Sequence, residues 1–226
     1  MTTDGFSAAP VPSYRLVPSR FPPIGLFDTV ATAADLAAVL DLVGWTNDRL
    51  VAERVRRLPE SDWVYSRPNS SIIMAAFLHV APSGMRFNGA DLGAWYAAAS
   101  LPTAVIEVGH HLRREAAATS VASLKRVYRE YTANIDGSYL DIRGQQAARP
   151  DIYTPDTYAA SQPFGEAIRA SGGNGIIYDS IRHAGGVNVV AYRTRTINHV
   201  TQCSHYEITV TAASSTINVH LIKGTT

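Results

Sequence analysis

The sequence predicts a single compact α+β domain with a mixed or antiparallel sheet and flanking helices. Apolar residues recur at both strand and helix spacing along the chain, and no internal repeat or interdomain linker divides it. The 226 residues are 46% hydrophobic, which is sufficient for one substantial core. We expect residues 14–226 to form this domain, preceded by a flexible, Pro-rich lead-in at residues 1–13.

The first third of the chain predicts a short strand, a pair of helices and a buried strand. Y-R-L-V at 14–17 alternates as a strand does. From Thr32, apolar residues repeat at helical spacing, and Thr46 or Asn47 is a suitable cap for a second helix. The continuous apolar run at 71–79 has the length of a buried strand.

The next segment predicts a strand followed by a helix. G-A-W-Y-A-A-A, from Gly93, has the composition of a buried strand. Ser100 is a suitable N-cap, because its hydroxyl can accept from a free backbone N–H and Pro102 then falls in the first turn. Glu107 would lie on this helix.

The second half of the chain is predicted to be mainly strands. Period-2 patterns, a helical segment that ends in glycines, and a final pair of strands around A-S-S-T indicate the elements. They are strands within 124–131 and 138–143, a helix within 154–173, strands within 175–180 and 187–193, and a β-hairpin at 205–222.

Composition excludes several classes of function. A formal net charge of +1 gives no broad basic surface, so nucleic acid is not an expected partner. The chain has no run of 18 apolar residues and no basic start followed by an apolar run, so we expect neither membrane association nor secretion. Cys203 is the only cysteine, which rules out an internal disulfide and cysteine metal motifs. A soluble cytoplasmic protein is expected.

Four polar residues form a candidate catalytic set. Arg86, Tyr96 and Glu107 fall in one short stretch, and Ser180 follows far downstream in I-I-Y-D-S-I-R-H. This combination suits the cleavage of a nucleotide glycosidic bond, because a fixed negative charge stabilises the sugar cation that develops. Glu107 can supply that charge, and Arg86 offers a planar fork of donors for diphosphate or ribose oxygens.

The other candidates have supporting roles. Tyr96 is suited to stacking on the departing ring or donating a hydrogen bond to it, and Ser180 to holding a carboxamide or a ribose hydroxyl. Arg15 and Arg182 are further candidates for phosphate contacts. One helical turn beyond the candidate carboxylate, His110 or His111 is placed to orient the site.

The pattern R-F-N-(x)7-Y-(x)10-E, followed by I-I-Y-D-S-I-R, resembles the RES domain family over about residues 14–193. Arg86 matches the family's arginine in R-[W/F]-N, Tyr96 its tyrosine, Glu107 its glutamate in A-x-x-E-V, and Ser180 its serine in S-x-R. Asp179 departs from the family pattern, which has small residues or Pro before the serine. The N-terminal helical section and the C-terminal hairpin also exceed the compact members.

The resemblance implies a fold related to ADP-ribosyltransferases and the toxin role of a toxin–antitoxin pair. It implies that NAD is a substrate rather than a cofactor, that its nicotinamide–ribose bond is cleaved by hydrolysis or phosphorolysis, and that an antitoxin of Xre-like type is a partner. A homo-oligomer stays open. The alternatives are an ADP-ribosyltransferase acting on a protein or small molecule, and a non-enzymatic nucleotide-binding module, which Asp179 and the extra terminal segments favour.

Three further motifs have structural rather than functional interpretations. E-V-G-H at 107–110 has the Glu-x-x-His spacing of di-iron helices but lacks the second copy that such a site requires, so no metal site is expected. G-G-N-G at 172–175 lacks the phosphate-loop ending and is typical of a helix stop. R-V-R-R at 54–57 suits the solvated end of a helix.

Overall fold

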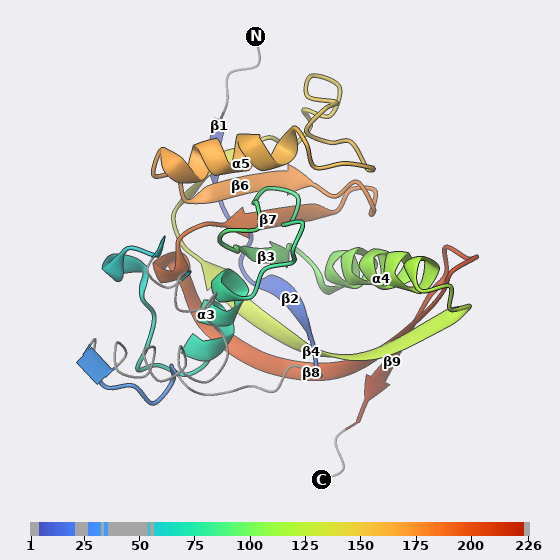
Figure 1. The fold of residues 1–226 in the computed structure, drawn as a ribbon, viewed down its shortest axis with the longest axis horizontal. Coiled ribbons are helices and arrows are strands. Elements are labelled where there is room, and N and C mark those ends of the chain that lie inside the picture. Colours follow the sequence, from blue (N-terminus) through green and yellow to red (C-terminus); the bar gives the residue numbers. More distant parts are fainter. Residues whose placement is uncertain (1–4, 21–26, 33, 36–53, 55–56, 224–226) are drawn as a thin grey trace.

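The computed structural model describes residues 5–20, 27–32, 34–35, 54 and 57–223. Within them, strands and helices are mixed in one α+β domain (Figure 1). The strands are β1 (Gly5–Ala8), β2 (Ser13–Pro18), β3 (Trp95–Ala98), β4 (Ser123–Ile135), β5 (Ser138–Asp141), β6 (Gly175–Asp179), β7 (Val187–Ala191), β8 (Ile197–Thr211) and β9 (Ile217–Ile222). The helices are α3 (Ser70–Leu78), α4 (Leu101–Ala118) and α5 (Ser161–Ala170), with 3-10 turns η1 (Glu60–Asp62) and η2 (Thr194–Thr196).

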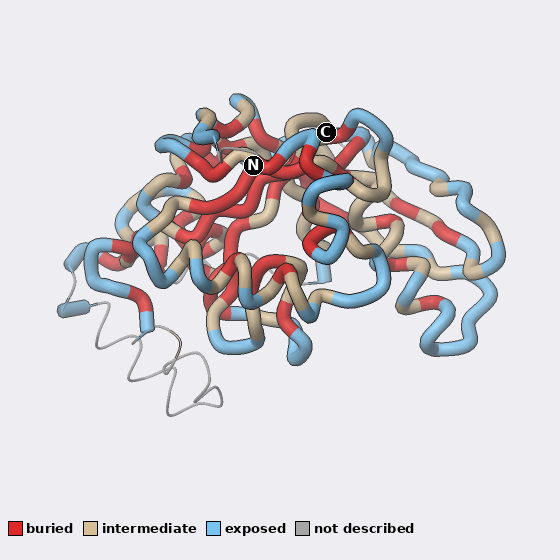
Figure 2. The backbone as a smooth tube through the Cα atoms, turned by 90° about the horizontal axis from the view of Figure 1, so that it is seen from above, coloured by how far each residue is buried: buried red, intermediate tan, exposed pale blue. Residues whose placement is uncertain are grey.

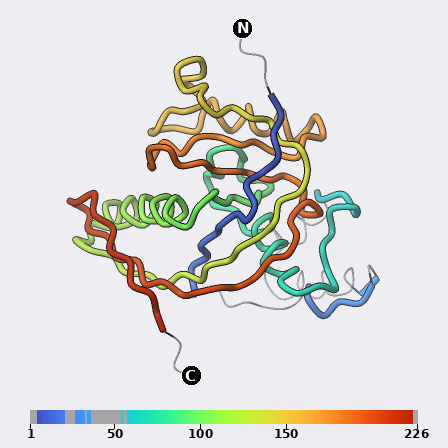
Figure 3. The backbone as a smooth tube through the Cα atoms, turned by 180° about the vertical axis from the view of Figure 1, so that it is seen from behind, coloured from blue at the N-terminus to red at the C-terminus, as the bar shows by residue number. Residues whose placement is uncertain are grey.

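The described strands form one mixed sheet in the order β1-β5-β6-β7-β3-β2-β4-β8-β9. Within this sheet β5 and β6 pair in parallel, and the other neighbours pair antiparallel. This confirms the predicted α+β class with a mixed sheet. The long strands β4 and β8 sweep across the molecule, and β1 and β9 lie at the two edges, as the reverse view in Figure 3 also shows.

Residues alternate between two cores on the central strands. Val190 of β7 packs with Ile176 and with Phe164 of α5, whereas Val189 belongs to a cluster with Phe77 of α3. A third cluster joins α4 to β2, β4 and β8. Buried residues are accordingly concentrated in the interior of the molecule in Figure 2.

Helix α4 begins as its cap predicts. The Ser100 hydroxyl accepts from the Thr103 backbone N–H at 3.4 Å, and Pro102 stands at the start of the helix. Further along, Gly109 lets Ile217 of β9 approach closely, because a Cβ at this position would lie 2.5 Å from the Ile217 Cδ1. The C-terminal hairpin therefore packs directly on the helix that carries Glu107.

The prediction of a strand at 71–79 is wrong, because this segment is the helix α3 (Ser70–Leu78). Met74 and Phe77 are 0% exposed, so the helix is buried on nearly every side and shows no polar face. A continuous apolar run cannot distinguish a buried strand from such a helix by periodicity alone. The Ala, Met and Leu residues of the run, which are good helix formers, decide the outcome.

The sheet begins earlier than the predicted domain start near Tyr14. Strand β1 lies within the expected lead-in and pairs antiparallel with β5. The Ser7 hydroxyl donates to Asp141 Oδ2 at 2.8 Å, which ties this edge strand to the sheet. The two helices predicted between Thr32 and residue 55 lie largely outside the described residues.

The remaining element predictions are confirmed within the described chain: β2, β3, β4, β5, α5, β6, β7 and the β8–β9 hairpin stand where patterns indicated them. Gly172 and Gly173 follow α5, as the helix-stop interpretation of G-G-N-G expects. No helix in the described ranges combines the length and apolar character that crossing a bilayer requires.

Candidate active site

A cavity of about 270 Å³ lies against the C-terminal part of β3 and the first turns of α4. It brings together most of the residues that the sequence singled out: Arg15, Arg86, Tyr96, Glu107 and His111 all line it. Ser180 and Arg182 belong to the loop that follows β6, beside the lining residues Tyr178 and Ile181.

Glu107 is held through one carboxylate oxygen. Its Oε1 accepts from the Ser180 hydroxyl at 2.7 Å and from Asn188 Nδ2 at 2.8 Å. Hydrogen bonds to a charged group are stronger than neutral ones and fix orientation. The carboxylate is therefore anchored at the cavity wall by two buried donors.

The Ser180 hydroxyl is fully occupied by protein partners. While it donates to Glu107, its oxygen accepts from the backbone N–H groups of Arg182 at 3.1 Å and His183 at 2.9 Å. Ser180 is only 6% exposed. Within the described contacts it orients Glu107, and the expected contact with a carboxamide or a ribose hydroxyl stays a prediction.

Asn188 is a site residue that our sequence analysis missed. It lies on β7, opposite Ala98 of β3, and is 5% exposed. The signal was present, since an asparagine within the apolar run V-N-V-V-A would be buried on a central strand and would require a partner. The partner is Glu107, which comes from another element and is not visible in the local pattern.

The loop after β6 is tied to the start of α4. His183 Nδ1 and Thr103 Oγ1 are 2.9 Å apart, and Thr103 is 1% exposed in the first turn of the helix. The His183 backbone N–H also donates to the Ser180 hydroxyl, which in turn donates to Glu107. The same loop therefore contacts the helix at two places, Thr103 in the first turn and Glu107.

Asp179 does not enter the cavity. Its Oδ2 accepts from the Gly144 backbone N–H at 2.6 Å, so the side chain holds the turn after β5. Neighbouring residues of a strand point to opposite faces, and Tyr178 is the one that lines the cavity. The departure from the family pattern at this position therefore leaves the contact between Glu107 and Ser180 intact.

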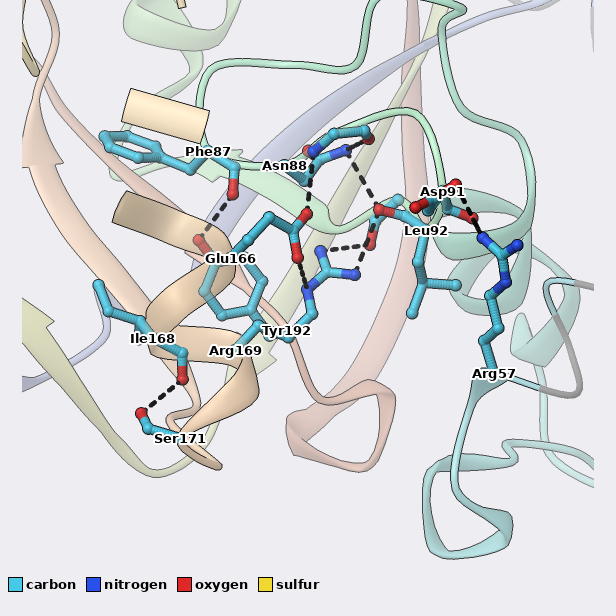
Figure 4. Close-up of polar contacts among 12 residues, drawn as sticks. Arg57, Phe87, Asn88, Asp91, Leu92, Glu166, Ile168, Arg169, Ser171 and Tyr192 are labelled. Atoms are coloured by element: carbon cyan, nitrogen blue, oxygen red, sulfur yellow. Dashed lines mark hydrogen bonds and ion pairs between the residues drawn. The ribbon is translucent and has the colours of Figure 1, made fainter. Parts of the chain in front are cut away.

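The loop that carries Arg86 is held by one face of α5 (Figure 4). Gln162 Nε2 donates to the carbonyls of Ser83 at 2.8 Å and Met85 at 2.9 Å. Glu166 and Arg169 share this face because residues three and four apart are neighbours on a helix. Their contacts continue along the same loop.

Glu166 Oε1 accepts from the Gly89 N–H at 2.9 Å, and Arg169 donates to the carbonyls of Leu92 and Gly93 at 3.2 and 2.8 Å (Figure 4). Gly165 allows the helix to approach, since a Cβ there would clash with the Phe87 carbonyl oxygen. The R-F-N motif is thus fixed from outside the cavity.

Arg86 is itself engaged by backbone oxygens. Its Nη1 donates to the carbonyls of Ile152 at 3.1 Å and Thr154 at 3.0 Å, and its guanidinium carbon lies 5.1 Å from the Tyr158 ring centroid. Tyr158 lines the cavity and was also missed, because it belongs to an irregular segment without a local motif.

Tyr96 holds the same loop from β3. Its hydroxyl donates to Asn88 Oδ1 at 2.8 Å and accepts from the Phe87 N–H at 2.9 Å. Burial raises the pKa of Tyr96 well above its usual value, so the hydroxyl stays protonated. Tyr96 lines the cavity, and its hydroxyl is engaged by the protein.

The remaining cations have separate anchors. Arg15 lies 4.8 Å over the Trp95 ring and donates to the Tyr96 carbonyl at 2.8 Å, and burial lowers its pKa to about 10. Arg182 donates to the Pro155 carbonyl at 3.0 Å. Burial lowers the pKa of Arg182, and the nearby positive charge of Arg86 lowers it further.

The two adjacent histidines differ in position. His111 lines the cavity and is exposed. Desolvation by the surrounding protein lowers its pKa, and the charge of Glu107 opposes this shift. His110 does not line the cavity, and burial lowers its pKa to about 4. In the part of the chain that the structure describes, no group of three His, Cys, Asp or Glu side chains is placed to hold a metal ion.

Comparison with known proteins adds a family match. The sequence model of the RES domain family matches residues 51–211, which is more than half of the chain. The match extends beyond the expected end near residue 193 and includes β8.

The chain is also similar to two individual proteins. The uncharacterized protein y4oC of Sinorhizobium fredii (strain NBRC 101917 / NGR234) is 23% identical over 194 residues, which cover 85% of this chain and 80% of that protein. A chain in the crystal structure of the M. tuberculosis MbcT–MbcA toxin–antitoxin complex is 25% identical, with a TM-score of 0.41, and the match covers 58% of this chain and 74% of that one.

Proposed function

The chain belongs to the RES domain family, and from this premise we propose that it is the toxin of a toxin–antitoxin pair that consumes NAD by cleaving the bond between nicotinamide and ribose. The family resemblance of Arg86, Tyr96, Glu107 and Ser180 suggests this chemistry. The observation that carries the proposal is the anchored Glu107 carboxylate in the cavity wall.

Glu107 supplies a fixed negative charge, which is the group that this reaction needs most. Nicotinamide leaves as a neutral molecule with the electron pair of the C1′–N bond, and positive charge develops on the ribose. A carboxylate whose orientation is already fixed stabilises this charge without reorganisation. Removing one such preorganised group typically lowers the rate by a factor on the order of a hundred to a thousand.

The cations around the cavity suit the rest of the substrate. Arg86 lines the same cavity as Glu107, and Arg182 lies close enough for the charges of Arg86 and Glu107 to affect its pKa. A diphosphate is a natural ligand for two guanidinium groups, each of which can donate in a planar fork. Arg15, bound to the Tyr96 carbonyl, is a further candidate for such a contact.

The nucleophile that captures the ribose determines the product. Water loses a proton to solvent and gives free ADP-ribose, whereas phosphate gives ADP-ribose 1-phosphate; both routes release one nicotinamide for each NAD. We include both in the proposal, together with action in the cytoplasm, where NAD and an antitoxin of Xre-like type would be available.

The test is NAD consumption by purified wild type and Glu107→Gln, with and without phosphate, and with products resolved by mass. We expect nicotinamide release by the wild type and a hundred- to thousandfold lower rate for Glu107→Gln, by the order of magnitude given for one lost electrostatic group. NAD left unchanged by folded wild type, free of antitoxin, would overturn the enzymatic proposal and favour a nucleotide-binding module.

A second arm addresses the acceptor and the partner. With NAD labelled in the adenosine half, label retained on a macromolecule would identify an ADP-ribosyltransferase instead. Co-expression with the protein encoded next to this chain tests the antitoxin: we expect it to restore growth that the wild type arrests, and the Glu107→Gln variant should not arrest growth at all.

A further inference from the structure

Residues 152–158, named the strap here, run from the buried Ile152 to Tyr158, which lines the cavity. The strap begins at the buried residues Ile152 and Tyr153, and the Tyr153 hydroxyl donates to the Ile142 carbonyl at 2.7 Å. Its middle, residues 155–157, is exposed. The strap therefore has a fixed start and continues along the protein surface.

Two arginines from different loops donate to the strap. Arg86, after α3, reaches the carbonyls of Ile152 and Thr154, and Arg182, after β6, reaches the carbonyl of Pro155. The two guanidinium groups are close enough for Arg86 to lower the pKa of Arg182. Backbone oxygens offset some of the repulsion between these like charges.

Tyr158 completes the contact at the end of the strap. Its half-buried ring lines the cavity, and the guanidinium carbon of Arg86 lies 5.1 Å from the ring centroid. The ring attracts the cation through its electron-rich face, while the Nη1 donor is held by two carbonyls. Ring and carbonyls together restrict where the other donors of Arg86 can point.

We propose that Tyr158 is a positioning residue for Arg86, and that the strap thereby determines affinity for the anionic part of the substrate. This inference rests on the proposed function. Glu107 is held by Ser180 and Asn188, neither of which belongs to the strap, so a change at Tyr158 should alter substrate binding far more than the chemical step.

The experiment compares Tyr158→Leu, Tyr158→Phe and the matched control Tyr206→Leu, a half-buried tyrosine on β8 that does not line the cavity. A cation–ring contact corresponds to roughly a two- to thirtyfold change in an equilibrium constant. We expect KM for NAD to rise by about tenfold in Tyr158→Leu, with kcat within about twofold of wild type. Tyr158→Phe keeps the ring and should stay close to wild type, and Tyr206→Leu should leave KM unchanged.

A second measurement does not depend on turnover. Hydrogen exchange of the backbone amides in residues 152–158 other than Pro155, followed without nucleotide, should be faster in Tyr158→Leu than in Tyr158→Phe or wild type. Melting temperature reports whether each variant is folded.

The outcomes distinguish failure of the proposed function from failure of the positioning role of Tyr158. Wild type that does not consume NAD would sink the proposed function, and the exchange comparison would still decide whether Tyr158 holds the strap on Arg86. Active wild type with an unchanged KM in Tyr158→Leu, or with Tyr158→Phe impaired as strongly as Tyr158→Leu, would overturn the positioning role and leave the proposed function standing.

Discussion

The Ser180 hydroxyl donates to the Glu107 carboxylate at 2.7 Å across 73 residues of sequence. Asn188 donates to the same oxygen from β7. The orientation of the carboxylate thus depends on a helix, the loop after β6 and a central strand, three elements that only the folded sheet brings together.

Asn188 provides the sharpest test of this arrangement. Asn188→Leu removes one hydrogen bond to a charged group, a contact worth about 1.5–3 kcal/mol, so kcat for NAD should fall by roughly ten- to a hundredfold. Asn188→Asp places a second carboxylate beside Glu107 and should be slower still near neutral pH. Its activity should partly recover at lower pH, where the introduced carboxyl group is protonated and can donate to Glu107.

Steady-state pH profiles of both variants check this prediction, with Asn218→Asp on β9 as the control for an added surface charge. Its side chain is exposed, and its profile should follow the wild type. An Asn188→Leu variant with wild-type kcat would show that Ser180 alone orients the carboxylate.

Gly165 should be intolerant of even a methyl group. A Cβ at this position meets the Phe87 carbonyl oxygen and the Tyr192 hydroxyl, whereas Gly89 has no atom within 4 Å of its ideal Cβ. We expect Gly165→Ala to lower the free energy of unfolding by about 1–3 kcal/mol, the usual cost of overpacking. Gly89→Ala, measured beside it in urea titrations, should be nearly neutral; equal stability of the two variants would contradict the close approach of α5 to the Arg86 loop.

Glu166→Ala should loosen that loop. The variant loses the acceptor for the Gly89 N–H and the ion pair with Arg169. Because Arg86 is carried by this loop, we expect KM for NAD to rise by a few-fold, about what one hydrogen bond of roughly 1 kcal/mol supports. The control is Asp91→Ala. Asp91 lies on the same loop, and the substitution breaks its exposed ion pair with Arg57, so KM should equal that of the wild type.

His110 makes stability depend on pH. Burial lowers its pKa from 6.5 to about 4 in the folded chain, so folding favours the neutral ring. This contribution is fully present above pH 6.5 and is lost as the pH falls toward 4, since the unfolded chain takes up the proton first. The free energy of unfolding, measured in urea, should therefore decrease less between about pH 7 and about pH 4.5 in His110→Asn than in wild type. The exposed His220→Asn should behave as wild type, and equal losses in all three proteins would rule out this role for His110.

Local patterns predicted much of the fold and the principal candidates. Strand β2 alternates, α4 has a cap at Ser100, and the final hairpin has two alternating runs, so each of these signals lies within one element. Helix α3 was predicted as a strand because burial on nearly every side removes the periodicity that identifies a helix.

The site shows the same distinction between local and long-range information. Arg86, Tyr96, Glu107 and His111 could be placed from their motif, and all line one cavity. Asn188 and Tyr158 could not, because their significance comes from contacts with Glu107 and Arg86 in other elements.

The contact of Gly109 with Ile217 joins the C-terminal hairpin to the helix that carries Glu107, although Ile217 does not line the cavity. A truncation that removes β9 would strip the apolar cover from the outer side of α4, in the same stretch of helix that holds Glu107. Loss of activity in such a truncated chain would then report a displaced helix. Measuring both activity and helix stability in a variant such as Ile217→Ala distinguishes support of the helix from participation in the reaction.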